Sequence, residues 1–206
     1  VSAPVQLDTN VTVSQSGSTA SNSILAGVVS GVGGLTKSGA GYVYLTQSNN
    51  SFGGPVTIGN GTLVPENIGL AGQNSSLGTN GTINLGGGSL AGTLRWGSGS
   101  VTNEATDKSF ALAGSTGGGT IDVRGTTSLL TLNGAIDTGA NASTRFLTLT
   151  GEGGVTVNGL ISGNGGLRVN GSKGRTVILA NADNSFGGPV TIDGNIAGQS
   201  YRVQVA

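Results

Sequence analysis

Short runs of alternating apolar and polar residues fill this chain from end to end. Residues 82–85, 120–123, 147–149 and 155–157 are examples. Alternation with a period of two is typical of β-strands that bury one face, and roughly 17 or 18 such runs of about three to five residues can be distinguished. Helical periodicity is missing, and the best candidate for a helical turn is the segment 101–112. The pattern therefore predicts an all-β fold.

An internal repeat organises these strands. Residues 50–58, with the sequence Asn-Ser-Phe-Gly-Gly-Pro-Val-Thr-Ile, recur letter for letter at 184–192, and residues 27–35 resemble 159–167. Between the two blocks, residues 42–45 align with 176–179, so Val43 and Leu45 match two further apolar residues. We expect these apolar positions to face inward and Tyr42 and Tyr44 to face outward.

Many short strands and a repeat favour a solenoid over a sandwich or a barrel. At about 22 residues per coil, the separation of the two copies predicts about six coils, and the whole chain roughly nine. Six Asn-Gly pairs, at Asn60, Asn80, Asn133, Asn158, Asn164 and Asn170, predict turns with positive φ. We expect one right-handed parallel β-helix domain over residues 1–206.

Residues 33–63 also resemble a known family. They read Gly-Gly-Leu-Thr-Lys, a glycine-containing turn, the strand 42–45, the Asn-Ser-Phe-Gly-Gly turn, and finally Gly-Thr-Leu. This order resembles the autotransporter-associated β-strand repeat, the glycine-rich repeat of bacterial autotransporter passengers. The chain departs from it at Pro55 and Pro189, where threonine is usual. The resemblance implies a secreted right-handed β-helix and supplies no catalytic residues.

Both ends of the chain alternate with unusual regularity. Apolar residues occupy every odd position over residues 1–14 except Thr9, and the last residues alternate as well. One interpretation is that 1–14 forms the first coil, with residues 8–10 as its corner. The other is that one or both termini, including an extended N-terminal strand, pair with another subunit by strand addition or end-to-end stacking. The residues predicted for such an interface are Val1, Ala3, Val5, Leu7, Val11, Val13, Tyr201, Val203 and Val205.

The amino-acid composition excludes several classes of function. Gly, Thr, Ser and Asn make up about half of the 206 residues, Cys and His are missing, and nine basic residues balance nine acidic ones. Disulfides, thiolate metal sites and imidazole catalysis are excluded. A nucleic-acid partner is not expected, because such binding needs basic excess. No apolar run is long enough for a transmembrane helix. The composition favours an extracellular or cell-surface location.

Candidate chemical groups are sparse. Asp122 and Asp137 lie near predicted strands but are not one coil apart, so no hydrolytic pair is expected. Asp183 and Asp193 are interpreted as turn residues rather than calcium ligands. The mixed-charge group of residues 104, 107 and 108 is interpreted as a solvated loop. No metal or cofactor is expected.

Aromatic and basic residues are the remaining candidates. Tyr42, Tyr44 and Trp96 are predicted to be exposed contacts for a sugar or a subunit. Phe52 and Phe186 are expected to fill the coil interior. Arg168, Lys173 and Arg175 form a small basic patch, interpreted as a solvated face.

These observations predict a non-enzymatic protein with itself as the expected partner. The leading hypothesis is a secreted structural subunit that self-assembles into an extracellular filament or surface layer by strand pairing or coil stacking. The alternative is an autotransporter-type passenger adhesin that binds a glycan or a surface. A carbohydrate-active β-helix enzyme is the third and least favoured hypothesis.

Overall fold

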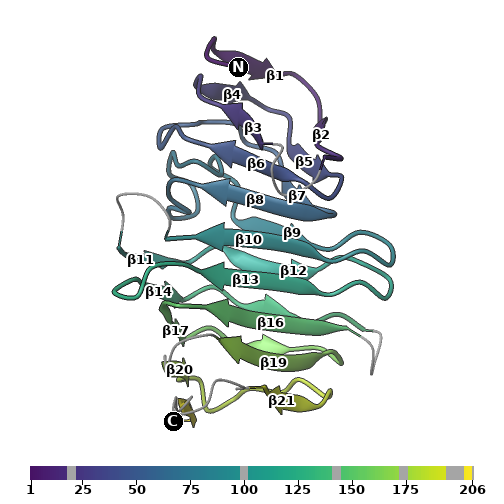
Figure 1. Ribbon diagram of the computed structural model, residues 1–206, viewed down its shortest axis with the longest axis vertical. Helices are drawn as coiled ribbons and strands as arrows, with labels where there is room; N and C mark the ends of the chain where they lie inside the picture. Colours follow the sequence, from purple (N-terminus) through teal and green to yellow (C-terminus); the bar gives the residue numbers. More distant parts are fainter. Residues whose placement is uncertain (18–21, 98–101, 141–144, 172–175, 194–201, 206) are drawn as a thin grey trace.

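The strands stack into a parallel β-solenoid. The computed structural model describes residues 1–17, 22–97, 102–140, 145–171, 176–193 and 202–205. All regular elements in these residues are β-strands, and every pairing between named strands is parallel. The chain winds from one end of the stack to the other, with the N-terminus in the first coil and the C-terminus in the last (Figure 1). The predicted all-β parallel β-helix is confirmed.

Four sheets form the sides of the solenoid. The eight-stranded sheet contains β3 (Asn22–Leu25), β6 (Tyr42–Leu45), β8 (Gly61–Pro65), β10 (Gly92–Trp96), β13 (Gly119–Val123), β16 (Phe146–Gly151), β19 (Gly166–Gly171) and β21 (Val190–Ile192). The seven-stranded sheet contains β2 (Val11–Ser14), β5 (Leu35–Ser38), β7 (Val56–Ile58), β9 (Thr82–Leu85), β12 (Ser109–Leu112), β15 (Ile136–Asp137) and β18 (Ile161–Ser162). A five-stranded sheet contains β11 (Asn103–Thr106), β14 (Leu129–Leu132), β17 (Gly154–Val157), β20 (Thr176–Leu179) and β22 (Arg202–Val205). The pair β1 (Val5–Leu7) and β4 (Val29–Gly31) completes the set.

The coils are longer and fewer than predicted. The eight strands of the largest sheet correspond to about seven turns, not nine. Tyr42 pairs with Thr62, whereas Gly61 pairs with Gly92, so the second of these turns is much longer than the first. The longer turn contains the loop 66–81, which the sequence repeat does not reveal. Coil length therefore varies with the loops at the corners, and a constant length overcounts the turns.

Irregular loops continue the backbone ladder between β4 and β11. Ser51 N donates to Val29 O (2.9 Å), and one turn later Ser75 N donates to Asn50 O (3.1 Å). Thr79 N donates to Phe52 O (3.0 Å) in the same stretch. The backbone groups of these loops are satisfied by coil stacking even where no strand is assigned.

The two sequence copies lie on different sides of the solenoid. In the first copy β5 belongs to the seven-stranded sheet and β6 to the eight-stranded sheet. In the second copy the matching strands β19 and β20 belong to the eight-stranded and five-stranded sheets. Five register steps lead from Leu35 to Ile161, and Leu167 lies one side further on. The copies are therefore separated by five turns and one side, which corrects the expected six turns.

The turn motif keeps its contacts despite this displacement. Asn50 Oδ1 accepts from Val29 N at 2.8 Å, and Asn184 Oδ1 accepts from Ile161 N at 2.8 Å. Val29 and Ile161 are themselves matching positions of the two copies. The repeated turn therefore forms the same hydrogen bond to the preceding coil on either side of the solenoid.

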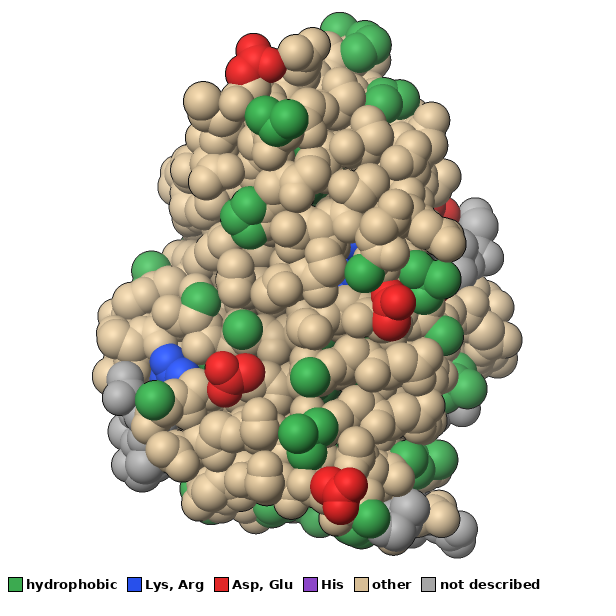
Figure 2. Space-filling view, turned by 180° about the vertical axis from the view of Figure 1, so that it is seen from behind, with side chains coloured by type: hydrophobic (Ala, Val, Ile, Leu, Met, Phe, Trp, Pro, Cys, Tyr) green, Lys and Arg blue, Asp and Glu red, His purple; other side chains and the backbone are tan. Residues whose placement is uncertain are grey.

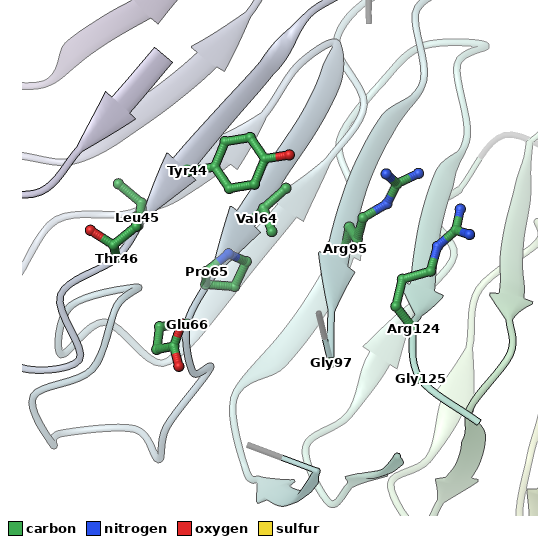
Figure 3. Close-up of a pocket in the computed structure, with 10 residues that line it drawn as sticks. All are labelled: Tyr44, Leu45, Thr46, Val64, Pro65, Glu66, Arg95, Gly97, Arg124 and Gly125. Atoms are coloured by element: carbon green, nitrogen blue, oxygen red, sulfur yellow. The ribbon is translucent and has the colours of Figure 1, made fainter. Parts of the chain in front are cut away.

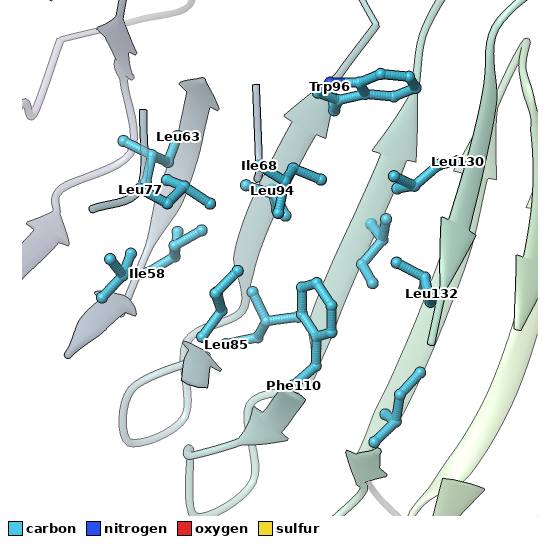
Figure 4. Packing of buried hydrophobic residues seen from close by; sticks show 14 of the residues in the cluster. Ile58, Leu63, Ile68, Leu77, Leu85, Leu94, Trp96, Phe110, Leu130 and Leu132 are labelled. Carbon is cyan, nitrogen blue, oxygen red and sulfur yellow. The ribbon is translucent and has the colours of Figure 1, made fainter. Parts of the chain in front are cut away.

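Inward-facing side chains form a continuous core. Val43 and Leu45 are buried and Tyr42 and Tyr44 are half-buried on the opposite face, as the alternation predicted. Leucine, isoleucine and aromatic side chains of successive coils stack in the interior (Figure 4). Phe52 is fully buried, which confirms its predicted role, whereas Phe186 is partly buried against the core in the last turns.

Most of the Asn-Gly pairs do not have the positive φ that was predicted for them. Of the six, only the pair at Asn60 has its glycine at positive φ, with Gly61 at 69°. At Gly134 and Gly159 a Cβ atom would instead overlap the backbone oxygen of the preceding coil, Lys108 O and Gly134 O respectively. The backbones of stacked corners approach so closely that a side chain would not fit.

The N-terminal segment forms the first coil. Residues 5–7 pair with β4 and residues 11–14 pair with β5, and the chain turns between them. The segment is therefore two short strands on two sides of the solenoid rather than one extended strand, as the first-coil interpretation proposed.

Candidate functional site

A groove over the eight-stranded sheet combines aromatic, cationic and acidic side chains. Outward positions in successive coils supply them: Tyr44 pairs with Val64, and Arg95 pairs with Asp122. The pairing of Leu63 with Leu94 places Arg95 beside Val64. The groove has a volume of about 580 Å³ and is lined by Tyr44, Leu45, Thr46, Val64, Pro65, Glu66, Arg95, Gly97, Arg124 and Gly125 (Figure 3).

Asp122 organises the basic wall of this groove. The residue is 3% exposed, and its Oδ2 accepts from Arg95 Nε at 2.8 Å and from Arg124 Nε at 3.0 Å. Arg124 is two residues after Asp122 on the same face of the chain, and Arg95 lies one turn earlier in register. The side chains of Arg95 and Arg124 remain 23% and 40% exposed. The shared carboxylate fixes both guanidinium groups at the groove surface.

Tyrosine side chains support the same wall. The guanidinium carbon of Arg95 lies 5.0 Å from the ring centre of Tyr42, a cation–π distance. The rings of Tyr42 and Tyr44 are 6.3 Å apart at an interplanar angle of 23°. Tyr42 therefore positions Arg95, while Tyr44 faces the groove. A contact role for the tyrosines stays a prediction.

Trp96 is not exposed, so the predicted surface contact at this residue is wrong. Its side chain is fully buried in the core. On β10, Leu94 and Trp96 point inward and Arg95 points outward. The period-two alternation could have placed Trp96 beside buried Leu94, and the exposed position belongs to the arginine instead.

The mixed-charge group around Glu104 is a hydrogen-bonded polar seam rather than a solvated loop, with Lys108 buried, Glu104 half-buried and Asp107 exposed. The segment forms β11 and β12 and contains no helical turn in its described residues. Glu104 Oε1 accepts from Ile68 N (2.8 Å) and Gly69 N (2.6 Å), and Asp107 Oδ1 accepts from Ala71 N (2.7 Å). Their carboxylates hold the loop 66–81 where β11 begins the five-stranded sheet.

Two lysine side chains donate hydrogen bonds to backbone carbonyl groups at the corners of the coils. Lys108 is fully buried and donates to Gly78 O and Asn80 O, at 3.1 and 2.6 Å. Lys37 is 1% exposed and donates to Ser38 O, Gly39 O and Asn60 O. Burial lowers the pKa of both ammonium groups. These lysines satisfy corner carbonyl groups and are not available to a ligand.

Burial raises the pKa of Glu104 above its ordinary value of 4.5, although the two backbone donors and the nearby Trp96 indole partly oppose the shift. The folded state therefore binds a proton more tightly than the unfolded state does. The resulting stabilisation is complete below pH 4.5 and is lost as pH rises through the folded pKa. In urea denaturation, the unfolding free energy of the wild type relative to Glu104→Gln should fall as pH rises above 4.5. A difference that stays constant with pH would contradict this assignment.

Other candidate groups remain separate. Asp122 lies in the eight-stranded sheet and Asp137 in the seven-stranded sheet, so they do not face each other as a catalytic pair. In the described ranges no three Asp or Glu side chains cluster as metal ligands would. Asp183 is exposed, and Asp193 lies 3.3 Å from Arg168.

The predicted basic patch is represented by Arg168 alone, because Lys173 and Arg175 lie outside the described residues. The guanidinium of Arg168 lies 4.8 Å from the ring centre of Phe146, away from the groove. Seen from behind, the solenoid carries only scattered charged and hydrophobic side chains among its described residues (Figure 2).

The predicted subunit-interface residues differ in exposure. Leu7 belongs to the core, and Val5 and Val13 pack against it. Val1, Ala3, Val11 and Val205 are exposed, at 69% for Val1 and Val205. Val203 pairs through its backbone with Val177, and Tyr201 lies outside the described residues. Pairing of these ends with another subunit stays a prediction.

Sequence reasoning found Tyr44 but missed most of the groove. Glu66, Asp122 and Arg124 lie outside the repeated segments, and none belongs to a motif. A signal existed, because the interval from Arg95 to Asp122 is one turn at this level of the solenoid. Using it required knowledge of the local coil length.

Comparison with known proteins finds similarity to repeats of autotransporter passengers in part of the chain. Residues 35–64 match the model of the passenger-associated-transport-repeat, and residues 128–193 match a model described as repeats of unknown function. The adhesin BmaC autotransporter of Brucella suis biovar 1 (strain 1330) is 33% identical over 132 residues, covering 61% of this chain. The chain spans 4% of that relative's length. No solved structure matches.

The chain thus carries an autotransporter passenger repeat, as its sequence predicted. Such a repeat indicates an extracellular, surface-exposed protein. Within the described residues there is no helix that could cross a membrane.

Proposed function

We propose that this chain is a non-enzymatic, adhesive part of a cell-surface passenger and that it binds a surface glycan through the groove. The observation that carries the proposal is the union of Tyr44, Arg95 and Arg124 in one concavity on the outer face. An aromatic ring beside fixed hydrogen-bond donors is a suitable platform for a polar ligand with apolar faces. The name of the similar Brucella protein, an adhesin, supports the same role.

Carboxylate geometry supports a role without catalysis. Hydrolysis of a glycosidic bond uses two carboxyl groups on either side of the bond, one of them free to protonate the leaving oxygen. Asp122 instead forms ion pairs with two arginines, and Asp137 lies on another side of the solenoid.

Self-assembly is the second candidate, and exposed apolar side chains of β21 favour it. Val190 and Ile192 occupy inward rows of the eight-stranded sheet, paired with buried Leu167 and Val169, yet are 52% and 53% exposed. Strand addition at such an edge would cover them. Filament formation would then be the function rather than ligand binding.

One experiment separates the two candidates. Purified protein is applied to a glycan array and, in parallel, to sedimentation velocity and negative-stain microscopy. We expect array binding by a monodisperse protein. Regular filaments that disappear when residues 1–14 are removed, without array binding, would instead establish the structural role. Monodisperse protein that binds no glycan would contradict both proposals.

A further inference from the structure

We propose that the groove selects an anionic saccharide, with an acidic group of the sugar held by Arg95 and Arg124 and a sugar ring placed against Tyr44. This inference rests on the proposed adhesive function and names its ligand class. The acidic group is a carboxylate or a sulfate, since both present several oxygen acceptors that match a guanidinium fork.

The charge balance of the basic wall favours an anion. Two guanidinium groups share the single carboxylate of Asp122, so these three side chains carry one net positive charge, and Glu66 supplies a second carboxylate, which lines the groove. Both arginines use their Nε atoms for that carboxylate, so the hydrogen bonds to Asp122 do not occupy their terminal nitrogens. These nitrogens are the donors that a ligand would meet.

The arginines are also held in place before a ligand arrives. Arg95 is fixed between Asp122 and the ring of Tyr42, and Arg124 is fixed by Asp122. Figure 3 shows both guanidinium groups extending to the same side of the sheet from neighbouring strands. Binding therefore costs less side-chain entropy than it would with free arginines.

The rest of the groove suits a sugar better than a small inorganic ion. Tyr44, Val64 and Pro65 provide an apolar wall beside the cationic one. Glu66 lies past Pro65, on the side away from the guanidinium groups (Figure 3). A volume of about 580 Å³ accommodates a ligand of one or a few rings.

A nucleic acid is a poorer match for this site. Binding of a polynucleotide depends on neutralising several phosphates, whereas this wall holds only two guanidinium groups that share one carboxylate, in a chain with no net charge. A single acidic substituent on an otherwise neutral sugar matches the charge that is present.

Titration calorimetry with four probes tests the inference. The probes are sialyllactose and a hyaluronan tetrasaccharide, which carry carboxylates, a heparin tetrasaccharide, which also carries sulfates, and lactose, which is neutral. We expect at least one acidic probe to bind at least tenfold more tightly than lactose. Binding confined to heparin would identify sulfate as the recognised group, and binding of the other acidic probes would identify carboxylate.

Arg124→Gln should weaken binding of the acidic probe by about tenfold or more, because a charge-assisted contact is lost. Arg168→Gln is the matched control: it removes the same charge from the same side of the solenoid, outside the groove, and should change binding less than about twofold. Tyr44→Ala should weaken the acidic probe as well. If Arg124→Gln does not fold, as judged by circular dichroism, Tyr44→Ala decides the test.

The outcomes separate the two proposals. Equal affinity for lactose and the acidic probes would overturn the anionic ligand class but leave the adhesive function standing. Equal losses in Arg124→Gln and Arg168→Gln would show general charge attraction and would overturn the groove as the site. If the protein binds none of the four probes and also binds no glycan on the array, both proposals are overturned.

Discussion

Replacing Asn50 with alanine should destabilise the protein by about 2–6 kcal/mol, because two buried backbone groups lose their partners at about 1–3 kcal/mol each. Asn50 is fully buried. Its Oδ1 accepts from Val29 N at 2.8 Å and its Nδ2 donates to Ser76 O at 3.0 Å. One side chain thus links three successive coils. Urea denaturation measures the loss, and amide hydrogen exchange at Val29 locates it.

The second sequence copy provides the matched control. Asn184 makes the same contact to Ile161 N, but it is only half-buried and its Nδ2 donates to Asn181 O in its own turn, at 2.7 Å. Asn184→Ala should therefore cost about 1 kcal/mol. Equal losses in the two variants would show that the linkage between three coils does not carry the stability.

Gly92→Ala should destabilise the solenoid severely, because the added methyl group would meet the backbone of the preceding coil. A Cβ atom there would overlap Ile58 O and approach Gly86 N to 3.0 Å, and all of these atoms are backbone. Gly92 is not at positive φ, so the effect is steric. Neighbouring coils would have to separate, and we expect a loss of about 3 kcal/mol or more in thermal or urea unfolding.

Gly53→Ala is the corresponding control. Gly53 is also without positive φ, but the nearest atom to its Cβ position is Thr79 Oγ1 at 3.9 Å. The variant should keep its stability or gain up to about 1 kcal/mol through the stiffer unfolded chain. A loss at Gly53 as large as that at Gly92 would mean that glycine is needed for its backbone freedom and not for close stacking.

Local pattern determined most of the architecture. Alternation fixed which side chains of β6 and β20 face the core, because a strand places successive residues on opposite faces whatever its neighbours are. The repeat and its turn motif predicted a passenger-type solenoid, because the Asn50 and Asn184 contacts to Val29 and Ile161 depend only on the coil directly before them. The length of each coil could not be predicted in this way, because the loop 66–81 lengthens one turn and has no counterpart in the sequence repeat.

The candidate site depends on how many residues each turn of the solenoid contains. Because these lengths were not known from the sequence, little of the site was predicted. A groove residue becomes a neighbour of another only through the length of the turn between them. Arg95 meets Asp122 because one turn leads from the first to the second, whereas the preceding turn, from Leu63 to Leu94, is longer. The repeated segments illustrate the same effect, as matching sequences lie on different sides of the solenoid.

By itself the sequence determined the all-β solenoid, the strand faces and the family of the repeat, since these follow from contacts within a coil or between adjacent coils. The tertiary structure alone decided that Glu104 and Lys108 lie in a polar seam and that Tyr44, Arg95 and Arg124 share a groove. The physical reason is that each loop adds its own number of residues to a turn. The length of the turn then determines which outward side chains of successive coils lie next to each other.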